Sequence, residues 1–165
     1  MELQSRKNIR LKSYDYNVPG YYFITVCTKQ KQKLLCDIVG TGVLDGPKVQ
    51  LSHCGKIAEA QLENMCSFYD GLRVEKYVIM PNHIHLLIHI TSCCNEVPEC
   101  ISPRDSKISK FIGSFKRFTN KSIGENIWQS RSYDHVVRGE RDYQEIWKYI
   151  DDNPSRWMED RFYIE

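Results

Sequence analysis

MPNHIHLLIHI, at residues 80–90, is the most informative segment of the chain. Its Pro81-Asn82 pair separates two apolar runs, which predicts a strand over residues 74–80, a break, and another strand over residues 83–90. Successive side chains of a strand point to opposite faces, so His83 and His85 share one face, about 6–7 Å apart along the strand. Two neutral imidazoles at this spacing can share one divalent ion.

The histidine pair also has a plainer interpretation, in which both are polar residues on a half-exposed strand. His89 lies on the same face further along, two steps beyond Leu87, and we expect it to be too distant to join a shared ion. The H-x-H pattern by itself does not decide between a metal site and a polar strand face.

Further elements are predicted on both sides of this segment. A β-branched and aromatic run indicates an earlier strand, glycines between short apolar pieces indicate a hairpin, and Ser52 can cap a helix. Gly124 ends one later helix, and Asn153-Pro154 stops the other. In chain order we expect a strand at 21–28, a hairpin at 36–51, a helix at 53–68, the strands at 74–80 and 83–90, a loop at 91–106, a helix at 107–122, a strand at 127–138 and a helix at 140–152.

This order predicts an α+β fold, a ferredoxin-like antiparallel sheet with helices packed on one face, plus an inserted hairpin. A length of 165 residues suits a single domain over residues 1–165. Residues 1–20 are polar and basic and end in Pro19-Gly20, so we expect them to form an extended arm.

Composition indicates an ordinary soluble globular protein, with 41% hydrophobic and 27% charged residues. The longest apolar runs, 77–80 and 84–90, are too short to span a bilayer, and the first residues lack the apolar stretch of a secretory signal. We therefore expect a cytoplasmic protein whose seven cysteines are reduced. Cys93, Cys94 and Cys100 do not match the spacings of structural zinc sites.

Basic residues are concentrated in two places, although the net charge is only +2. A stripe without acidic residues runs along the helix expected at 107–122, and it suits a phosphate backbone as well as it suits a solvated helix face. The N-terminal arm adds further basic residues. The candidate DNA-binding residues are Lys107, Lys110, Arg117 and Lys121 on the helix, where Ser114 completes the stripe, and Arg6, Arg10 and Lys12 in the arm.

The expected last helix carries a second candidate pair. Tyr143, Ile146, Trp147 and Ile150 recur at spacings of three and four and form its core stripe. Tyr149 falls off that stripe and shares a face with Asn153, one turn later. A tyrosine there can be a nucleophile beside a metal ligand, or a rim residue that packs against its neighbours.

The segment at 80–87, MPNHIHLL, resembles the HUH motif of the single-tyrosine transposases. Three further blocks, in order along the chain, resemble the REP-associated tyrosine transposases (RAYT proteins). They are RLKSYDY at 10–16 with GYYFIT at 20–25, WQ at 128–129 with DHVVR at 134–138, and YIDDNP at 149–154 with Trp157. The segment 130–133 between the last two differs in detail from the family, and this concerns fine DNA specificity.

The resemblance implies a ferredoxin-like fold and an enzyme that cuts and rejoins single-stranded or hairpin DNA. The family's tyrosine becomes linked to a 5′ phosphate and releases a 3′ hydroxyl. Carried over by position, the nucleophile is Tyr149, and the metal ligands are His83, His85 and Asn153. This mixture of ligands suits Mg²⁺ or Mn²⁺. Family members work as monomers or homodimers.

Two other functions compete with this one. A domesticated nucleic-acid-binding protein would keep the fold without turnover, but pure binding requires none of the four site residues. A small metal-dependent hydrolase of another substrate class is the other alternative, and the basic stripe argues weakly against it. A covalent protein–DNA adduct would separate all three functions.

Overall fold

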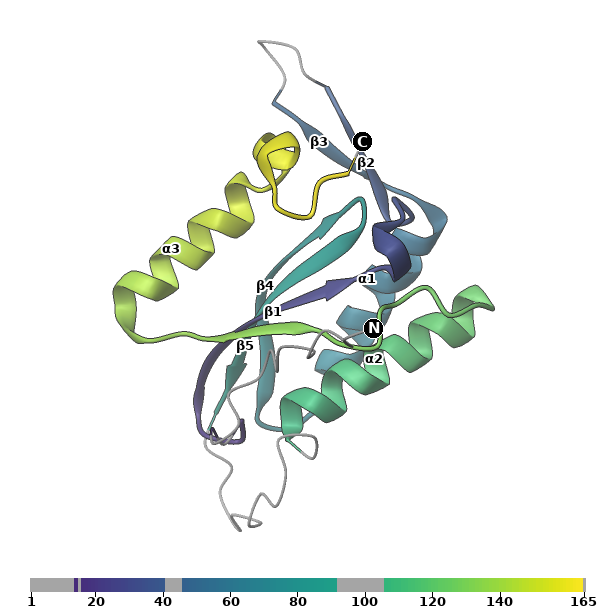
Figure 1. Cartoon of the computed structure of the whole chain (residues 1–165). Helices are drawn as coiled ribbons and strands as arrows, with labels where there is room; N and C mark the ends of the chain where they lie inside the picture. The colour runs from purple at the N-terminus through teal and green to yellow at the C-terminus, as the bar shows by residue number, and fades with distance from the viewer. Residues whose placement is uncertain (1–13, 15, 41–45, 92–105, 165) are drawn as a thin grey trace, which may run out of the picture.

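A four-stranded antiparallel sheet forms the centre of the computed structural model, which describes residues 14, 16–40, 46–91 and 106–164. Its strands lie in the order β4-β5-β1-β6 (Figure 1). Every neighbouring pair is antiparallel, and β5 pairs with β4 on one side and β1 on the other. The strands are β1 (Gly20–Cys27), β4 (Leu72–Met80), β5 (His83–Ile90) and β6 (Tyr133–Val136).

The connections between these strands follow the ferredoxin-like pattern that the sequence predicts. Helix α1 (His53–Cys66) joins β1 to β4, and helix α2 (Lys107–Ile123) joins β5 to β6. The expected hairpin is confirmed as a separate two-stranded sheet of β2 (Cys36–Val39) and β3 (Lys48–Leu51), inserted between β1 and α1. A short 3₁₀ turn, η1 (Lys29–Lys31), precedes it.

Helices α1 and α2 cover one face of the sheet and form the main core there. Ser52 begins α1, where its hydroxyl accepts the Gly55 N–H, and Ser106 caps α2 in the same way. Gly124 ends α2 in the left-handed region, with a φ of 91°. Ile84, Leu86 and Ile88 of β5 lie on this face and are fully buried.

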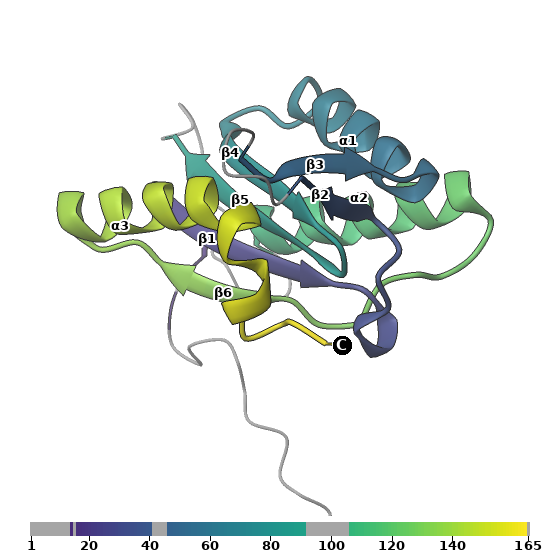
Figure 2. The same cartoon turned by 90° about the horizontal axis from the view of Figure 1, so that it is seen from above.

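Helix α3 (Gly139–Asp152) lies on the opposite face of the sheet, as Figure 2 shows. Its buried Ile146 and Ile150 pack on Leu87 of β5, beside Phe23 of β1. The prediction that the helices share one face is therefore wrong for this helix. The reason is that the sheet also has apolar side chains on this second face, Leu87 of β5 with Phe23 and Val78 of its neighbouring strands, and α3 buries them.

Strand β6 is shorter than the predicted strand at 127–138. Trp128 makes only an isolated bridge to Thr28, and pairing with β1 begins at Tyr133. Between these points the backbone carbonyls face a side chain, because Lys116 Nζ on α2 donates to the oxygens of Gln129 (2.9 Å) and Arg131 (3.1 Å). These bonds give the two carbonyls a side-chain partner, while the Gln129 N–H still donates to the Cys27 carbonyl at 2.9 Å.

Several expectations fall outside the described residues. They concern the basic arm, with Arg6, Arg10 and Lys12, and the loop that holds Cys93, Cys94 and Cys100. Within the described ranges, no helix is both long and apolar enough to cross a membrane.

Candidate active site

His83 and His85 stand at the beginning of β5, on the face that α3 covers. Their Nε2 atoms are 3.0 Å apart, and both side chains are fully buried. Adjacent ligands of an octahedral ion bonded at about 2.1 Å are about 3.0 Å from each other. The alternation of the strand therefore brings the two nitrogens to a separation that fits one shared ion.

The tautomer of His83 is set by Asn82. The Asn82 amide nitrogen donates to the carbonyls of Phe162 (2.8 Å) and Lys31 (3.2 Å), so its oxygen faces His83 Nδ1 at 2.8 Å. His83 must then carry its proton on Nδ1 and present a lone pair on Nε2. Such an outer hydrogen bond commonly orients a ligand histidine.

His85 is oriented by a hydroxyl, since its Nδ1 lies 2.8 Å from Thr25 Oγ1 on the neighbouring strand β1. A threonine hydroxyl can donate or accept. When it accepts, His85 Nδ1 carries the proton and Nε2 is free to bind a cation. Both histidines can therefore direct Nε2 lone pairs at the same point.

Burial keeps both imidazoles neutral, because the charged form loses its hydration. It lowers the pKa of His83 to about 4, an effect that Asp160 partly opposes and that Arg161 and Lys31 reinforce. The pKa of His85 also falls well below 6.5, first through burial and then through His83. Neutral imidazole is the form that binds metal ions.

Tyr149 reaches the histidine pair from the last turns of α3. Its hydroxyl lies 3.4 Å from His85 Nε2 and donates to Asp160 Oδ2 at 3.0 Å. Its ring meets Phe23 and His85 edge to face, and 39% of the residue remains exposed. Burial and the Asp160 carboxylate raise the pKa of Tyr149 to about 12, so the phenol is protonated at neutral pH.

Asn153 follows one turn later and is only 2% exposed. Its Nδ2 donates to Asp160 Oδ2 at 2.9 Å. Its Oδ1 is buried, and no hydrogen-bond donor among the described residues reaches it. An unpaired buried carbonyl costs about 1–3 kcal/mol, and a bound cation would remove that cost, so this atom fits the role of a metal ligand.

Asp160 is the site residue that sequence reasoning missed. After α3 the chain makes a 3₁₀ turn, η3 (Pro154–Glu159), and returns to the sheet beside the β4–β5 turn (Figure 1). One ligand atom each from His83, His85 and Asp160 then lies within 4.8 Å of the other two. No periodicity or motif marks Asp160, because only the folded turn brings it to the histidines.

His89 lies away from this cluster, in agreement with the expectation from the strand spacing. Its ring stacks on Tyr21, with centroids 4.2 Å apart, and its Nδ1 is 3.4 Å from Glu75. His89 therefore has a packing role, and it can serve as a control for substitutions of His83 and His85 on the same strand.

The basic stripe lies on α2, and therefore on the other face of the sheet from the histidines. Lys110, Arg117 and Lys121 are exposed there. The positive charges beside the site itself are Lys31 and Arg161, which sequence reasoning did not single out. Both pack on Phe162, with Lys31 Nζ 5.6 Å and the Arg161 guanidinium 4.6 Å from its ring centre.

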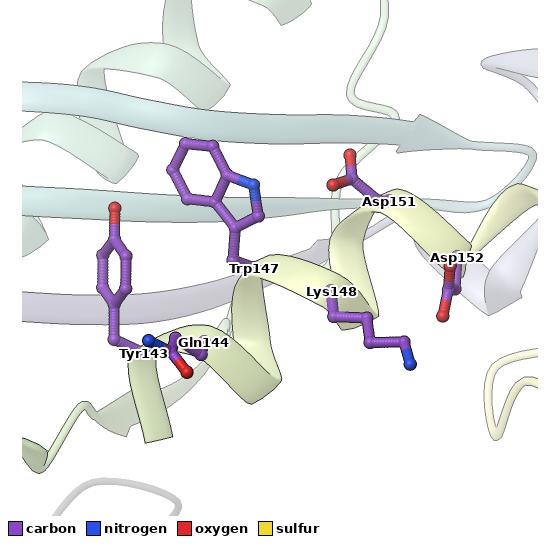
Figure 3. A pocket seen from close by; sticks show the side chains of 6 residues that line it. All are labelled: Tyr143, Gln144, Trp147, Lys148, Asp151 and Asp152. Atoms are coloured by element: carbon purple, nitrogen blue, oxygen red, sulfur yellow. The ribbon is translucent and has the colours of Figure 1, made fainter. Parts of the chain in front are cut away.

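A separate surface hollow of about 460 Å³ lies along α3 (Figure 3). Tyr143 and Trp147 extend into it in the same direction, and Asp151 and Asp152 stand at its other end. Lys76 spans β4 and α3 there, 4.0 Å from the Trp147 ring and 2.7 Å from Asp151. Its carboxylates make it a poor surface for phosphate, and it is distinct from the histidine cluster.

Comparison with known proteins gives a consistent family. The family model described as "Transposase IS200 like" matches residues 18–153. An uncharacterized protein of Haemophilus influenzae is 31% identical over 99% of this chain and 96% of its own length. The REP-associated tyrosine transposase of Escherichia coli is 31% identical over half of this chain and 44% of its own.

The fold has a counterpart among solved structures. A REP-associated tyrosine transposase bound to a REP hairpin superposes with a TM-score of 0.62, over 90% of this chain and 74% of the other. The two are 20% identical, so this similarity concerns the fold. It agrees with the strand order and connections described above.

Proposed function

Because the chain belongs to the IS200-like transposase family, we propose that it cuts and rejoins single-stranded DNA through Tyr149 with a divalent metal ion. The family accounts for a transposase-type enzyme. The proposal adds three points to this: a bound metal ion, a single-stranded DNA substrate and a covalent tyrosine intermediate.

The convergence of Tyr149 on the histidine pair carries the proposal. A phenolic oxygen lies 3.4 Å from one of two imidazole nitrogens that are themselves 3.0 Å apart. Packing alone does not explain why a hydroxyl approaches two buried, neutral histidines whose Nε2 atoms lie so close together. A protein that only binds nucleic acid needs no such arrangement.

His83, His85 and Asn153 would hold the ion, and Asp160 lies beside them, hydrogen-bonded to Asn153. Imidazole nitrogens mixed with an amide oxygen suit Mg²⁺ or Mn²⁺. Such an ion polarises a bound phosphate and stabilises the charge that develops on it. The unpaired Asn153 Oδ1 is the observation that supports this donor set.

The Tyr149 oxygen would attack the phosphorus of a phosphodiester. An O–P bond to the tyrosine forms as the bond from phosphorus to the 3′ oxygen breaks. The tyrosine loses its proton, which points at Asp160 Oδ2 in the structure, and the leaving oxygen gains one and becomes a 3′ hydroxyl. One phosphodiester replaces another, so the strand can be rejoined by the reverse reaction without an external energy source.

Lys31 and Arg161 are placed to offset phosphate charge at the site. Phe162 lies over both imidazoles, with ring centres 4.7 Å from His83 and 5.9 Å from His85.

A hairpin-containing single strand is the proposed substrate, since the relative of like fold was solved with a REP hairpin. The exposed cations of α2, Lys110, Arg117 and Lys121, would bind its backbone away from the site, together with Lys107. The basic arm, with Arg6, Arg10 and Lys12, would add to this surface.

Incubation with end-labelled hairpin DNAs and Mn²⁺ tests the proposal. We expect a covalent protein–DNA product on a denaturing gel, and its loss in EDTA, in His83→Ala and in Tyr149→Phe. Tyr143→Phe is the matched control, since Tyr143 lies on the same helix and packs on Tyr21. Cleavage in EDTA at the normal rate would rule out the proposed role of the metal. DNA binding without any cleavage would favour a nucleic-acid-binding protein without turnover.

A further inference from the structure

The Asp160 carboxylate is held by three hydrogen-bond donors. Its Oδ1 accepts the Phe162 N–H at 2.7 Å. Its Oδ2 accepts from Asn153 Nδ2 at 2.9 Å and from the Tyr149 hydroxyl at 3.0 Å. One side chain therefore contacts both Tyr149 of α3 and Asn153, the residue that follows the helix.

This contact decides which end of the Asn153 amide faces Asp160 and which end is left without a partner. A carboxylate only accepts hydrogen bonds, so the atom of Asn153 that faces it must be the NH₂ group. The oxygen is then turned away from Asp160 and remains buried without a donor in the part of the chain that the structure describes. If the amide flipped, its oxygen would meet a carboxylate oxygen, and its NH₂ group would take the buried position that the oxygen now holds.

We propose that Asp160 is a positioning residue that fixes the Asn153 amide so that its oxygen serves as a metal ligand. The inference rests on the proposed function, because it requires a metal at the histidine pair. The same carboxylate accepts a hydrogen bond from the Tyr149 hydroxyl. The lone pairs of the tyrosine oxygen can then face a phosphate.

Asp160→Asn is the informative change, because it keeps the shape and removes one acceptor. If its oxygen stays on the Phe162 N–H, its NH₂ group faces Asn153 and favours the flipped amide. If the new side-chain oxygen at position 160 turns to Asn153 instead, the new NH₂ group faces the Phe162 N–H, and two donors then oppose each other. The loss of an outer hydrogen bond to a ligand commonly costs 10–100-fold in metal affinity, and we expect a loss of about that size here.

The test measures Mn²⁺ affinity by electron paramagnetic resonance on the full chain, without DNA. Asp160→Asn should weaken binding in the wild-type background and have almost no effect in Asn153→Ala, where no amide remains to be positioned. Exchanging the two residues, Asp160→Asn with Asn153→Asp, should restore binding, because position 153 then offers an oxygen in either orientation. Glu159→Gln, an exposed neighbour of equal charge, is the control and should bind Mn²⁺ normally.

Two results would overturn the inference alone. One is normal Mn²⁺ affinity in Asp160→Asn while His83→Ala has lost it. The other is an equal loss from Asp160→Asn in the wild-type and Asn153→Ala backgrounds, which would make Asp160 a ligand in its own right. If wild type and His83→Ala bind Mn²⁺ equally, the metal site of the proposed function fails, and this inference fails with it. Thermal melts of each variant show that the comparison is between folded proteins.

Discussion

Mn²⁺ should stabilise this protein against heat, and His83→Ala should abolish that gain. A ligand at 100 times its Kd stabilises the folded state by about 2.7 kcal/mol. For a chain of 165 residues, 1 kcal/mol corresponds to about 2–4 °C in Tm, so the expected rise is about 5–11 °C. The structure supports the full gain at pH 7, because the pKa of His83 is about 4 and protons do not compete with the ion.

The assay is a thermal melt with increasing Mn²⁺, compared with a melt in EDTA. His83→Ala also loses the bond to Asn82, so its Tm without metal should fall, and the quantity to compare is the rise on adding Mn²⁺. His89→Ala is the matched control on the same strand, since His89 stacks on Tyr21 outside the cluster, and it should keep the whole rise. Equal rises in wild type and His83→Ala would refute the reasoning.

Two further predictions concern DNA binding and the fold. Neutralising Lys110, Arg117 and Lys121 should weaken DNA binding and reduce its salt slope by about one unit each, in a salt titration of binding to hairpin DNA. The exposed Arg141 on α3 is the control, and an unchanged slope in the triple variant would make the stripe a solvated face. Gly55→Ala should cost about 1–3 kcal/mol in a denaturant melt, because a Cβ there overlaps the carbonyl oxygen of Leu35. Gly113→Ala, with open space around it, should instead stabilise α2 by about 0.5–1 kcal/mol; equal effects would contradict the packing described here.

Local patterns predicted the elements and the strand part of the site. Alternation along β5 placed His83 and His85 on one face, since a strand's period holds wherever the strand extends. The spacing of Tyr149 and Asn153 placed them one turn apart on α3 for the same kind of reason. The resemblance to a family supplied their roles, which the spacing had left open.

Tertiary contacts account for what the sequence did not predict. Asp160 reaches the site only because η3 turns the chain back, and nothing in its neighbours has a helix or strand period. The position of α3 followed from two-sided burial of β5, for which the run of apolar residues around Leu87 was an unused signal. Before β6, the carbonyls of Gln129 and Arg131 are bound by Lys116 on another element, a contact that no local pattern predicts.

The central claim is that Tyr149 is the nucleophile, and mapping of a trapped adduct tests it most directly. The covalent product formed with hairpin DNA and Mn²⁺ is digested with nuclease and protease, and mass spectrometry locates the residual phosphonucleotide. We expect it on the peptide that contains Tyr149, joined through a 5′ phosphate, and we expect no adduct in Tyr149→Phe. An adduct on Tyr133 or Tyr143, or normal cleavage by Tyr149→Phe, would contradict the account.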